Sequence, residues 1–288
     1  MTRLAVVGVG RIGGEVAYLS SLLGVADELI LYDSAPGLLK AQVLDLLHTG
    51  IDIAVSTEKE DVRNADICVF SAGLPRNPAV KTRADLFAAN LPVIREIAGL
   101  LEEFAGIVVT VTNPMDANNY FLHQITGIPR ERCIGFGGQL DSARFGVALK
   151  SRGIAGTPFV LGEHGEHQVP VFSRLTGRVD DAQRNEILTE LRGSSMGVIR
   201  GKGGTVFGPA FHISQLIRMI VDDCQELVSC SSVLDGEYGL SGCSLGVPAR
   251  IGRNGIHSIE EWKLDAWESL KMAEAGRFTS GLCMGRVP

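Results

Sequence analysis

The first half of the chain alternates short apolar runs with helix-patterned segments, and this alternation constrains the fold more than any other feature. Most of the runs are continuously apolar, which is typical of parallel strands that are buried on both faces. Strands are expected at 4–7, 28–32, 67–71, 106–112 and 133–136, and helices at 12–23, 37–48, 85–103 and 115–125. Strand–helix–strand order of this kind predicts an α/β fold with a doubly wound parallel sheet.

A glycine-rich turn follows the first run and opens the first helix. It fits the GxGxxG pattern, in which glycines permit a tight turn and bring the backbone close to a pyrophosphate at the helix N-terminus. Asp33 ends the second run, where a carboxylate can accept hydrogen bonds from both ribose hydroxyls and repels a 2′-phosphate. The pattern therefore predicts a Rossmann-type domain that binds NAD rather than NADP. The expected cofactor-binding residues are Gly8, Gly10, Arg11, Ile12, Gly13 and Asp33.

The order of predicted helices and strands changes in the second half of the chain, which predicts a mixed α+β domain. Helices are expected near 139–152, 182–200 and 206–226, strands near 227–234 and 243–251, and a last helix from about Ser258. We divide the chain into a Rossmann-type NAD-binding domain, 1–138, and a catalytic α+β domain, 139–288. No low-complexity linker separates the two, so we expect a tight interface, where clefts tend to form.

Composition argues against several classes of partner. The chain has 288 residues and a formal charge of −6 without a cluster of Lys or Arg, which argues against nucleic acid. No apolar run approaches the roughly 20 residues of a membrane-spanning helix, and a strand begins too early to leave room for a signal peptide. The six cysteines lack CxxC spacing, so we expect buried free thiols, no metal site and a cytoplasmic protein.

Polar residues that suit one kind of chemistry gather where the strands end. Ligands of open parallel sheets bind beyond the carboxyl ends of the strands, and residues 71–73 and 111–114 lie there. Further along, Asp141 and Arg144 are one helical turn apart, and His164 lies between glycines at a strand end. A hydride-transfer enzyme acting on a small hydroxy acid needs a proton acceptor, a group that orients it and a carboxylate anchor. An imidazole, a carboxylate and a guanidinium can fill these roles.

A series of motifs, spread over nearly the whole chain, resembles the lactate/malate dehydrogenase family, and most closely its archaeal and bacterial malate dehydrogenases. The motifs are Ala72-Gly73…Arg76…Arg83-Ala-Asp85-Leu86, Val111-Thr-Asn113-Pro114, Gln139-Leu-Asp141-Ser-Ala-Arg144, Gly162-Glu-His164-Gly165, Gly201-Lys-Gly-Gly-Thr205 and Gly246-Val-Pro-Ala-Arg250-Ile-Gly252.

The resemblance implies a separate task for each site residue. His164 would exchange the proton of the substrate C2 hydroxyl, and Asp141 would fix the tautomer of His164. Arg144 would bind the substrate carboxylate through two hydrogen bonds, and Arg83 would polarise the carbonyl as a loop closes. Asn113 would contact the substrate oxygen or the nicotinamide, and Asn90 is expected to bind the cofactor.

Three of these residues also have simpler interpretations. Asp141 and Arg144, at positions i and i+3, can pair on a helix surface, and Asn113 can cap the helix that follows it. A second histidine, His167, lies close to His164, and the sequence assigns it no role.

Substrate choice depends on Arg76. In this family an arginine at that place pairs with a second carboxylate, which favours malate and oxaloacetate, since pyruvate would leave a desolvated charge unpaired. Arg76 and Arg83 are seven positions apart where relatives typically show six, so Lys81 is an alternative partner if Arg76 is displaced. From Phe278 a glycine-containing tail is expected in place of the charged helix of relatives.

We therefore expect NAD-dependent oxidation of malate, or the reverse reaction, on a small dicarboxylic hydroxy or oxo acid. The alternatives are a lactate or broader 2-hydroxy-acid dehydrogenase and a non-catalytic dinucleotide-binding redox sensor. The resemblance also implies a homo-oligomer, either dimer or tetramer.

Overall fold

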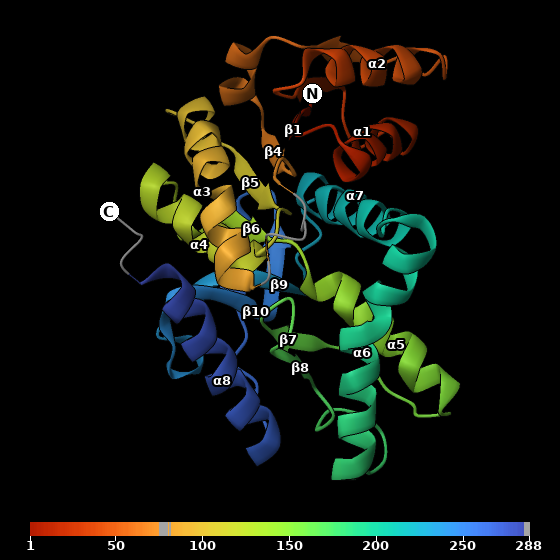
Figure 1. The fold of residues 1–288 in the computed structure, drawn as a ribbon, viewed down its shortest axis with the longest axis vertical. Coiled ribbons are helices and arrows are strands. Elements are labelled where there is room, and N and C mark those ends of the chain that lie inside the picture. Colours follow the sequence, from red (N-terminus) through yellow and green to blue (C-terminus); the bar gives the residue numbers. More distant parts are fainter. Residues whose placement is uncertain (75–79, 81, 285–288) are drawn as a thin grey trace.

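The computed structural model describes residues 1–74, 80 and 82–284, and its first half forms six parallel strands (Figure 1). They are β1 (Arg3–Val7), β2 (Glu28–Tyr32), β3 (Ala54–Ser56), β4 (Ile67–Phe70), β5 (Ile107–Thr110) and β6 (Cys133–Gly135). Their order across the sheet is β3-β2-β1-β4-β5-β6, which is the order of a doubly wound dinucleotide-binding sheet. The expected fold class is confirmed, and of these six strands only the short β3 was not expected from the sequence.

Helices cover both faces of this sheet. The first half contributes α1 (Arg11–Leu22), α2 (Pro36–Leu47), α3 (Arg83–Leu100) and α4 (Met115–Thr126), and the second half contributes α5 (Gly138–Ser151), α6 (Asp181–Lys202), α7 (Phe207–Val221) and α8 (Ala266–Cys283). Helices α1 and α7 lie on one face, and α3 and α4 lie on the other. Successive residues of β1 point to opposite faces. Leu4 and Val6 pack into a core with α1 and α7, whereas Ala5 and Val7 pack into a core with α3 and α4. This is why the strand is apolar throughout.

The second half extends the same sheet instead of building a separate one. Its strands are β7 (Val160–Gly162), β8 (Gln168–Pro170), β9 (Glu226–Asp235), β10 (Ser241–Gly252) and β11 (Gly255–Ile259). Strand β9 pairs antiparallel with β6 through Ile134–Ser232 and Gly135–Ser231, so the sheet continues across the predicted division at residue 138. Short 3-10 turns lie at Lys59–Asn64, Arg130–Arg132 and Glu237–Gly239.

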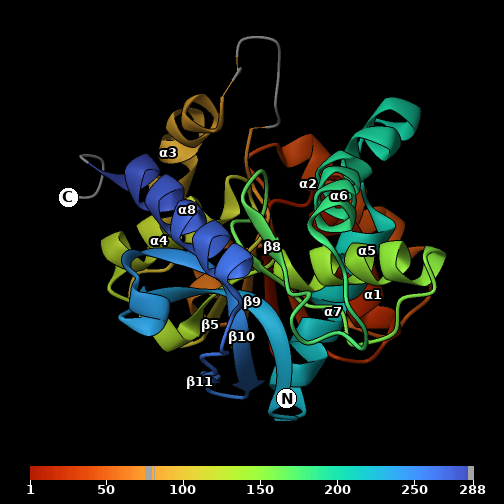
Figure 2. The ribbon, with the colours of Figure 1, turned by 90° about the horizontal axis from the view of Figure 1, so that it is seen from below.

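Two expectations about the C-terminal segment are wrong. Ser258 lies in β11, and the last helix, α8, begins only at Ala266. The run from Ser258 to Glu261 has the S-x-x-E spacing of a capping box, but the box that forms joins Asp265 to Glu268. Helix α8 also continues past Phe278 to Cys283, where a non-helical tail was expected. The Cys283 side chain is buried in the core that α3 and α4 cover. The helix packs against β10 (Figure 2).

The cysteines, the helices and the metal-binding side chains bear on the expectations from composition. Five of the six cysteines are buried, and the exception is the exposed Cys224. Within the described ranges no helix is long and apolar enough to cross a membrane. The same residues contain no group of His, Cys, Asp and Glu side chains arranged to hold a metal ion.

Candidate active site

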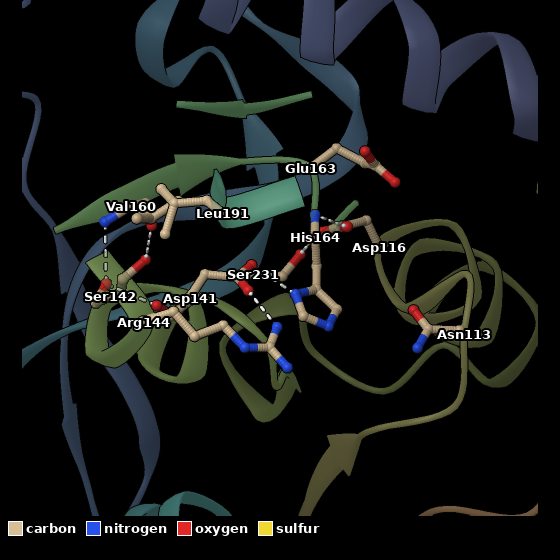
Figure 3. A network of polar contacts seen from close by, with 12 residues as sticks. Asn113, Asp116, Asp141, Ser142, Arg144, Val160, Glu163, His164, Leu191 and Ser231 are labelled. Atoms are coloured by element: carbon tan, nitrogen blue, oxygen red, sulfur yellow. Dashed lines mark hydrogen bonds and ion pairs between the residues drawn. The ribbon is translucent and has the colours of Figure 1, made fainter. Parts of the chain in front are cut away.

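His164 lies in the turn between β7 and β8, directly above the start of α5 (Figure 3). Its Nδ1 is 2.6 Å from Oδ2 of Asp141, a residue of α5 that is almost fully buried. A Cβ atom on Gly137 would be 2.5 Å from the His164 ring, so a glycine is needed where α5 begins. Burial by itself would lower the pKa of His164, but the charge and hydrogen bond of Asp141 outweigh burial and raise that pKa above its ordinary value.

A second buried carboxyl holds the backbone of His164. Asp116, in the first turn of α4, accepts the His164 amide proton at 2.7 Å and the Ser231 hydroxyl proton at 2.6 Å. The chain of buried hydrogen bonds continues through Ser244 to Asn119, so it ties β9 and β10 to α4. Burial raises the pKa of Asp116 to about 7. This role of Asp116 was not expected from the sequence, because an acid in the first turn of a helix is usually explained by the helix dipole.

Asp141 and Arg144 do pair, as the simpler interpretation predicts, but they do so inside the site. Arg144 Nη1 is 3.1 Å from Asp141 Oδ1, while the other carboxylate oxygen holds His164. The Arg144 side chain is only 19% exposed, so the pair is not an ordinary surface contact. His212 of α7 lies near this guanidinium, and burial together with the Arg144 charge lowers the pKa of His212.

Arg83 reaches the same place from the first turn of α3. Its Nη1 donates to Asn113 Oδ1 at 3.4 Å, and its Nη2 donates to the His164 carbonyl oxygen at 3.0 Å. Asn113 follows β5 but does not cap α4, because the N-cap position is Pro114. The tertiary structure therefore brings five predicted residues together around the His164 turn. Figure 3 shows Arg144 and Asn113 on either side of the His164 ring.

The glycine turn has the shape that a pyrophosphate needs. Gly8 has a φ of +93°, and a Cβ there would be 2.2 Å from the Ala72 nitrogen. A Cβ on Gly13 would be 1.9 Å from the Gly8 carbonyl oxygen, so helix and turn are in close contact. Gly10 is different, since no atom lies within 4 Å of its Cβ position. Gly10 is the N-cap of α1 and has no side chain to bind the first-turn N–H groups of Arg11, Ile12 and Gly13, which suits an anion.

Two other predicted cofactor residues make backbone contacts. Asp33 Oδ2 accepts the Val9 amide proton at 3.0 Å, which places the carboxylate beside the glycine turn. Asn90 is fully buried, with Oδ1 accepting from the Leu74 amide at 2.8 Å and Nδ2 donating to the Asn113 carbonyl at 3.2 Å. Asn90 thus fixes the segments that follow β4 and β5, and its direct contact with a cofactor stays a prediction. Arg76 and Lys81 lie outside the described residues.

This arrangement can exchange a proton and bind an anion at one place. His164 has Nδ1 on a buried carboxylate, which leaves Nε2 to accept or donate a proton. The guanidinium of Arg144 is fixed by Asp141, and that of Arg83 is fixed by the His164 carbonyl oxygen. A carboxylate bound to one of them would present an adjacent hydroxyl or carbonyl to the imidazole.

Comparison with known proteins gives matches over nearly the whole chain. The family model described as lactate/malate dehydrogenase, NAD binding domain, matches residues 2–135, and the corresponding alpha/beta C-terminal domain matches residues 139–277. A malate dehydrogenase of Natronomonas pharaonis is 37% identical over 298 residues, which cover 96% of each chain.

Solved structures agree with these matches. A malate dehydrogenase from Archaeoglobus fulgidus in complex with NADH has a TM-score of 0.88 and 32% identity, and 98% of each chain is covered. A minor L-lactate dehydrogenase from Enterococcus mundtii has a TM-score of 0.89 and 27% identity, covering 98% of this chain and 97% of that one.

Proposed function

Because the chain belongs to the lactate/malate dehydrogenase family, we propose that it is an NAD-dependent malate dehydrogenase that interconverts (S)-malate and oxaloacetate. The observation that carries this function is the Asp141–His164 pair with Arg144 bonded to Asp141 and Arg83 bonded to the His164 carbonyl, at the carboxyl edge of a dinucleotide-binding sheet. It supplies a proton acceptor and two cations for a substrate anion within one site.

The chain's own residues handle the proton and the charge. In malate oxidation, His164 Nε2 accepts the C2 hydroxyl proton, and the buried Asp141 carboxylate stabilises the imidazolium that results. Arg144 binds the C1 carboxylate, and Arg83 with Asn113 faces the C2 oxygen. NAD, when bound at Gly8, Gly10 and Gly13, supplies the acceptor for the C2 hydride. In the reverse direction His164 donates the proton to the carbonyl oxygen of oxaloacetate.

The choice of a dicarboxylic substrate rests on Arg76 and on the similarity to malate dehydrogenases. An arginine that is desolvated on closure needs a carboxylate partner, and pyruvate offers none. We expect Arg76→Gln to reduce kcat/KM with oxaloacetate far more than with pyruvate. Steady-state NADH oxidation with both substrates measures this. Comparable kcat/KM of the unmodified enzyme for the two substrates would favour a broader 2-hydroxy-acid dehydrogenase instead.

The proton role of His164 has its own test. His164→Asn should reduce kcat by about 10²–10⁴-fold, since that is the usual contribution of a positioned acid–base group. His257→Asn, on the exposed face of β11, is the matched control and should leave kcat unchanged. NADH oxidation that His164→Asn leaves unaltered would instead support the non-catalytic redox sensor.

We also propose a homo-oligomer in the cytoplasm. Apolar surface that is exposed in a contiguous patch often marks a protein–protein contact, and α1, α2 and α7 expose large apolar side chains. They are Tyr18 and Leu22 of α1, Leu38, Leu44 and Leu47 of α2, and Phe207 and Phe211 of α7. Free cysteines are typical of a reducing compartment. Sedimentation equilibrium should give a mass of two or four chains, and Leu44→Glu should lower it. A monomer at all concentrations would contradict this assembly.

A further inference from the structure

A third buried acid lies beside the catalytic turn, and the mechanism above does not use it. Glu163 precedes His164, and its side chain is 3% exposed. Figure 3 shows that the Glu163 carboxylate points away from Asp141 and the His164 ring. Its two oxygens face two cationic or polar side chains, so the acid has a defined place in the network around the turn.

One oxygen of Glu163 faces the guanidinium of Arg83. Glu163 Oε1 is 3.5 Å from Arg83 Nε, and the Arg83 side chain is 14% exposed. A Cβ atom on Gly165 would be 1.9 Å from Arg83 Nη2, so the guanidinium lies directly against the turn. Since a buried cation needs a compensating anion, Glu163 is the charge that permits Arg83 to lie here.

The other oxygen of Glu163 is held by His167. Glu163 Oε2 accepts the His167 amide proton at 2.9 Å and lies 3.6 Å from His167 Nδ1. The His167 ring stacks on Phe278 of α8, with centroids 4.3 Å apart and planes at 24°. His167 is thus fixed from α8, and it fixes the carboxylate in turn. Burial would raise the pKa of Glu163, but the contacts with His167 and Arg83 lower that pKa below its ordinary value, so the acid stays ionised.

Three buried polar atoms in this cluster have no hydrogen-bond partner among the described residues. They are Arg83 Nε, Glu163 Oε1 and His167 Nδ1. Each lies at ion-pair distance from its neighbour, 3.5 or 3.6 Å, which is slightly too long for a hydrogen bond. The contact between Arg83 and Glu163 is therefore an ion pair without a hydrogen bond, so it is the charge of Glu163 that acts on the guanidinium.

We propose that Glu163 is a positioning residue, whose carboxylate sets where the Arg83 guanidinium lies relative to the reacting carbonyl, with His167 and Phe278 anchoring the carboxylate from α8. The inference rests on the proposed function, because Arg83 acts on the substrate only in that reaction. Glu163 itself does not touch the substrate. It acts through Nε of Arg83, while Nη1 and Nη2 face Asn113 and the His164 turn.

A double-mutant cycle on Arg83 and Glu163 tests this coupling. Glu163→Gln keeps the size of the side chain but removes its charge, and it should reduce kcat with oxaloacetate by about 10-fold or more. The KM for NADH should stay unchanged. In an Arg83→Gln background the same change should have less than about a twofold further effect on kcat, because the residue through which Glu163 acts is absent. Glu166→Gln, an exposed acid on the same turn, is the matched control and should leave kcat unaltered.

Thermal unfolding of the same four proteins separates positioning from general stability. Arg83→Gln should lower the midpoint because it leaves Glu163 buried and unpaired, and adding Glu163→Gln should restore the midpoint but not kcat. A normal kcat in Glu163→Gln, or reductions in kcat that multiply in the double variant, would overturn the proposal.

His167→Phe gives a second route if Glu163→Gln does not fold. This change keeps the ring stacked on Phe278 and removes the polar contact with Glu163. It should reduce kcat by about threefold or more, and only while Arg83 is present. An unaltered kcat, or the same reduction without Arg83, would overturn the proposal. If the unmodified protein fails to oxidise NADH with oxaloacetate, the proposed function itself is wrong, which is a different outcome.

Discussion

Close approach between single residues determines the geometry of the His164 site. The imidazole lies on the backbone of Gly137, Asp141 binds its Nδ1, and Asp116 binds its amide. The contacts come from two parts of the chain, the start of α5 and the first turn of α4, and together they fix the ring and the backbone of His164. Single substitutions at these contacts should therefore change catalysis without unfolding the protein.

Gly137→Ala is expected to impair catalysis by displacing the imidazole. The new Cβ would be 2.5 Å from His164 Cγ, so the ring must move, and a shift of about 1 Å can cost roughly 100-fold in rate. We expect kcat to fall at least tenfold while the circular dichroism spectrum is retained. Gly99→Ala in α3 is the control, because no atom lies within 4 Å of its Cβ position. Equal kcat for the two variants would contradict this prediction.

The pH dependence should follow the raised pKa of His164. Malate oxidation needs the neutral imidazole, so its kcat/KM should rise with pH. The midpoint of this rise should lie above about 6.5, the ordinary pKa of histidine, and kcat/KM for oxaloacetate reduction should fall over the same range. Asp141→Asn removes the charge that raises this pKa. The acid limb of the oxidation profile should then move to lower pH, with a lower plateau because the tautomer is no longer fixed. Profiles of both proteins between pH 5 and 9 measure the shift, and an unmoved acid limb would contradict it.

At the scale of elements, the caps decide where the helices begin. Helices α6 and α8 both start with a capping box, Asp180 with Gln183 and Asp265 with Glu268. The caps differ in one respect, since Asp265 also lies 2.6 Å from Arg184 Nη1. Asp265 thus joins the start of α8 to α6, and α8 carries Phe278 to the His164 turn.

Asp265→Ala should destabilise the protein more than Asp180→Ala does. Loss of an N-cap alone costs about 0.5–2 kcal/mol, and Asp265→Ala also leaves Arg184, which is 14% exposed, without this carboxylate. Urea unfolding at neutral pH gives the two free energies. Burial raises the pKa of Asp265, but its hydrogen bonds and Arg184 outweigh burial and lower it. The stabilisation by the ionised carboxylate is therefore complete above about pH 4 and is lost as the pH falls below that value and through the lowered pKa, so the difference between the variants should shrink there. A larger effect of Asp180→Ala would contradict this view of the two caps.

At the scale of the whole molecule, the two predicted domains share a sheet and a core. Strand β9 continues the sheet from β6. The core that holds Leu4 and Val6 also contains Ile213 of α7 and Cys230 of β9. Helix α7 lies along α1 (Figure 1). The division at residue 138 therefore separates two sequence regions that depend on each other for burial.

A fragment of residues 1–138 should fail to fold as a stable unit. Without α7 and β9, one face of α1 and the open edge of β6 would be exposed to water, and such surfaces aggregate. We expect no cooperative thermal transition by circular dichroism, in contrast to the sharp transition of the full chain. A sharp transition of the fragment would show that its own half of the core is sufficient.

Much of the fold and part of the site could be predicted because their determinants are local. The glycine turn, Asp33 and the apolar runs of β1, β2 and β5 act over a few neighbouring residues. Asp141, Arg144 and His164 are recognisable from the motifs that surround them. In contrast, Glu163 and Asp116 act through partners that are distant in sequence, and no spacing indicates them.

Local patterns are sufficient to predict the doubly wound sheet, the glycine turn and the residue types of the site, because helical periodicity, strand hydrophobicity and turn chemistry operate between near neighbours. Long-range packing, in contrast, brings Arg83 to a turn 81 residues away, places Asp116 on the His164 backbone and joins β9 to the parallel sheet. These contacts depend on how separately predictable elements pack. Burial of apolar faces fixes that packing for the whole molecule at once.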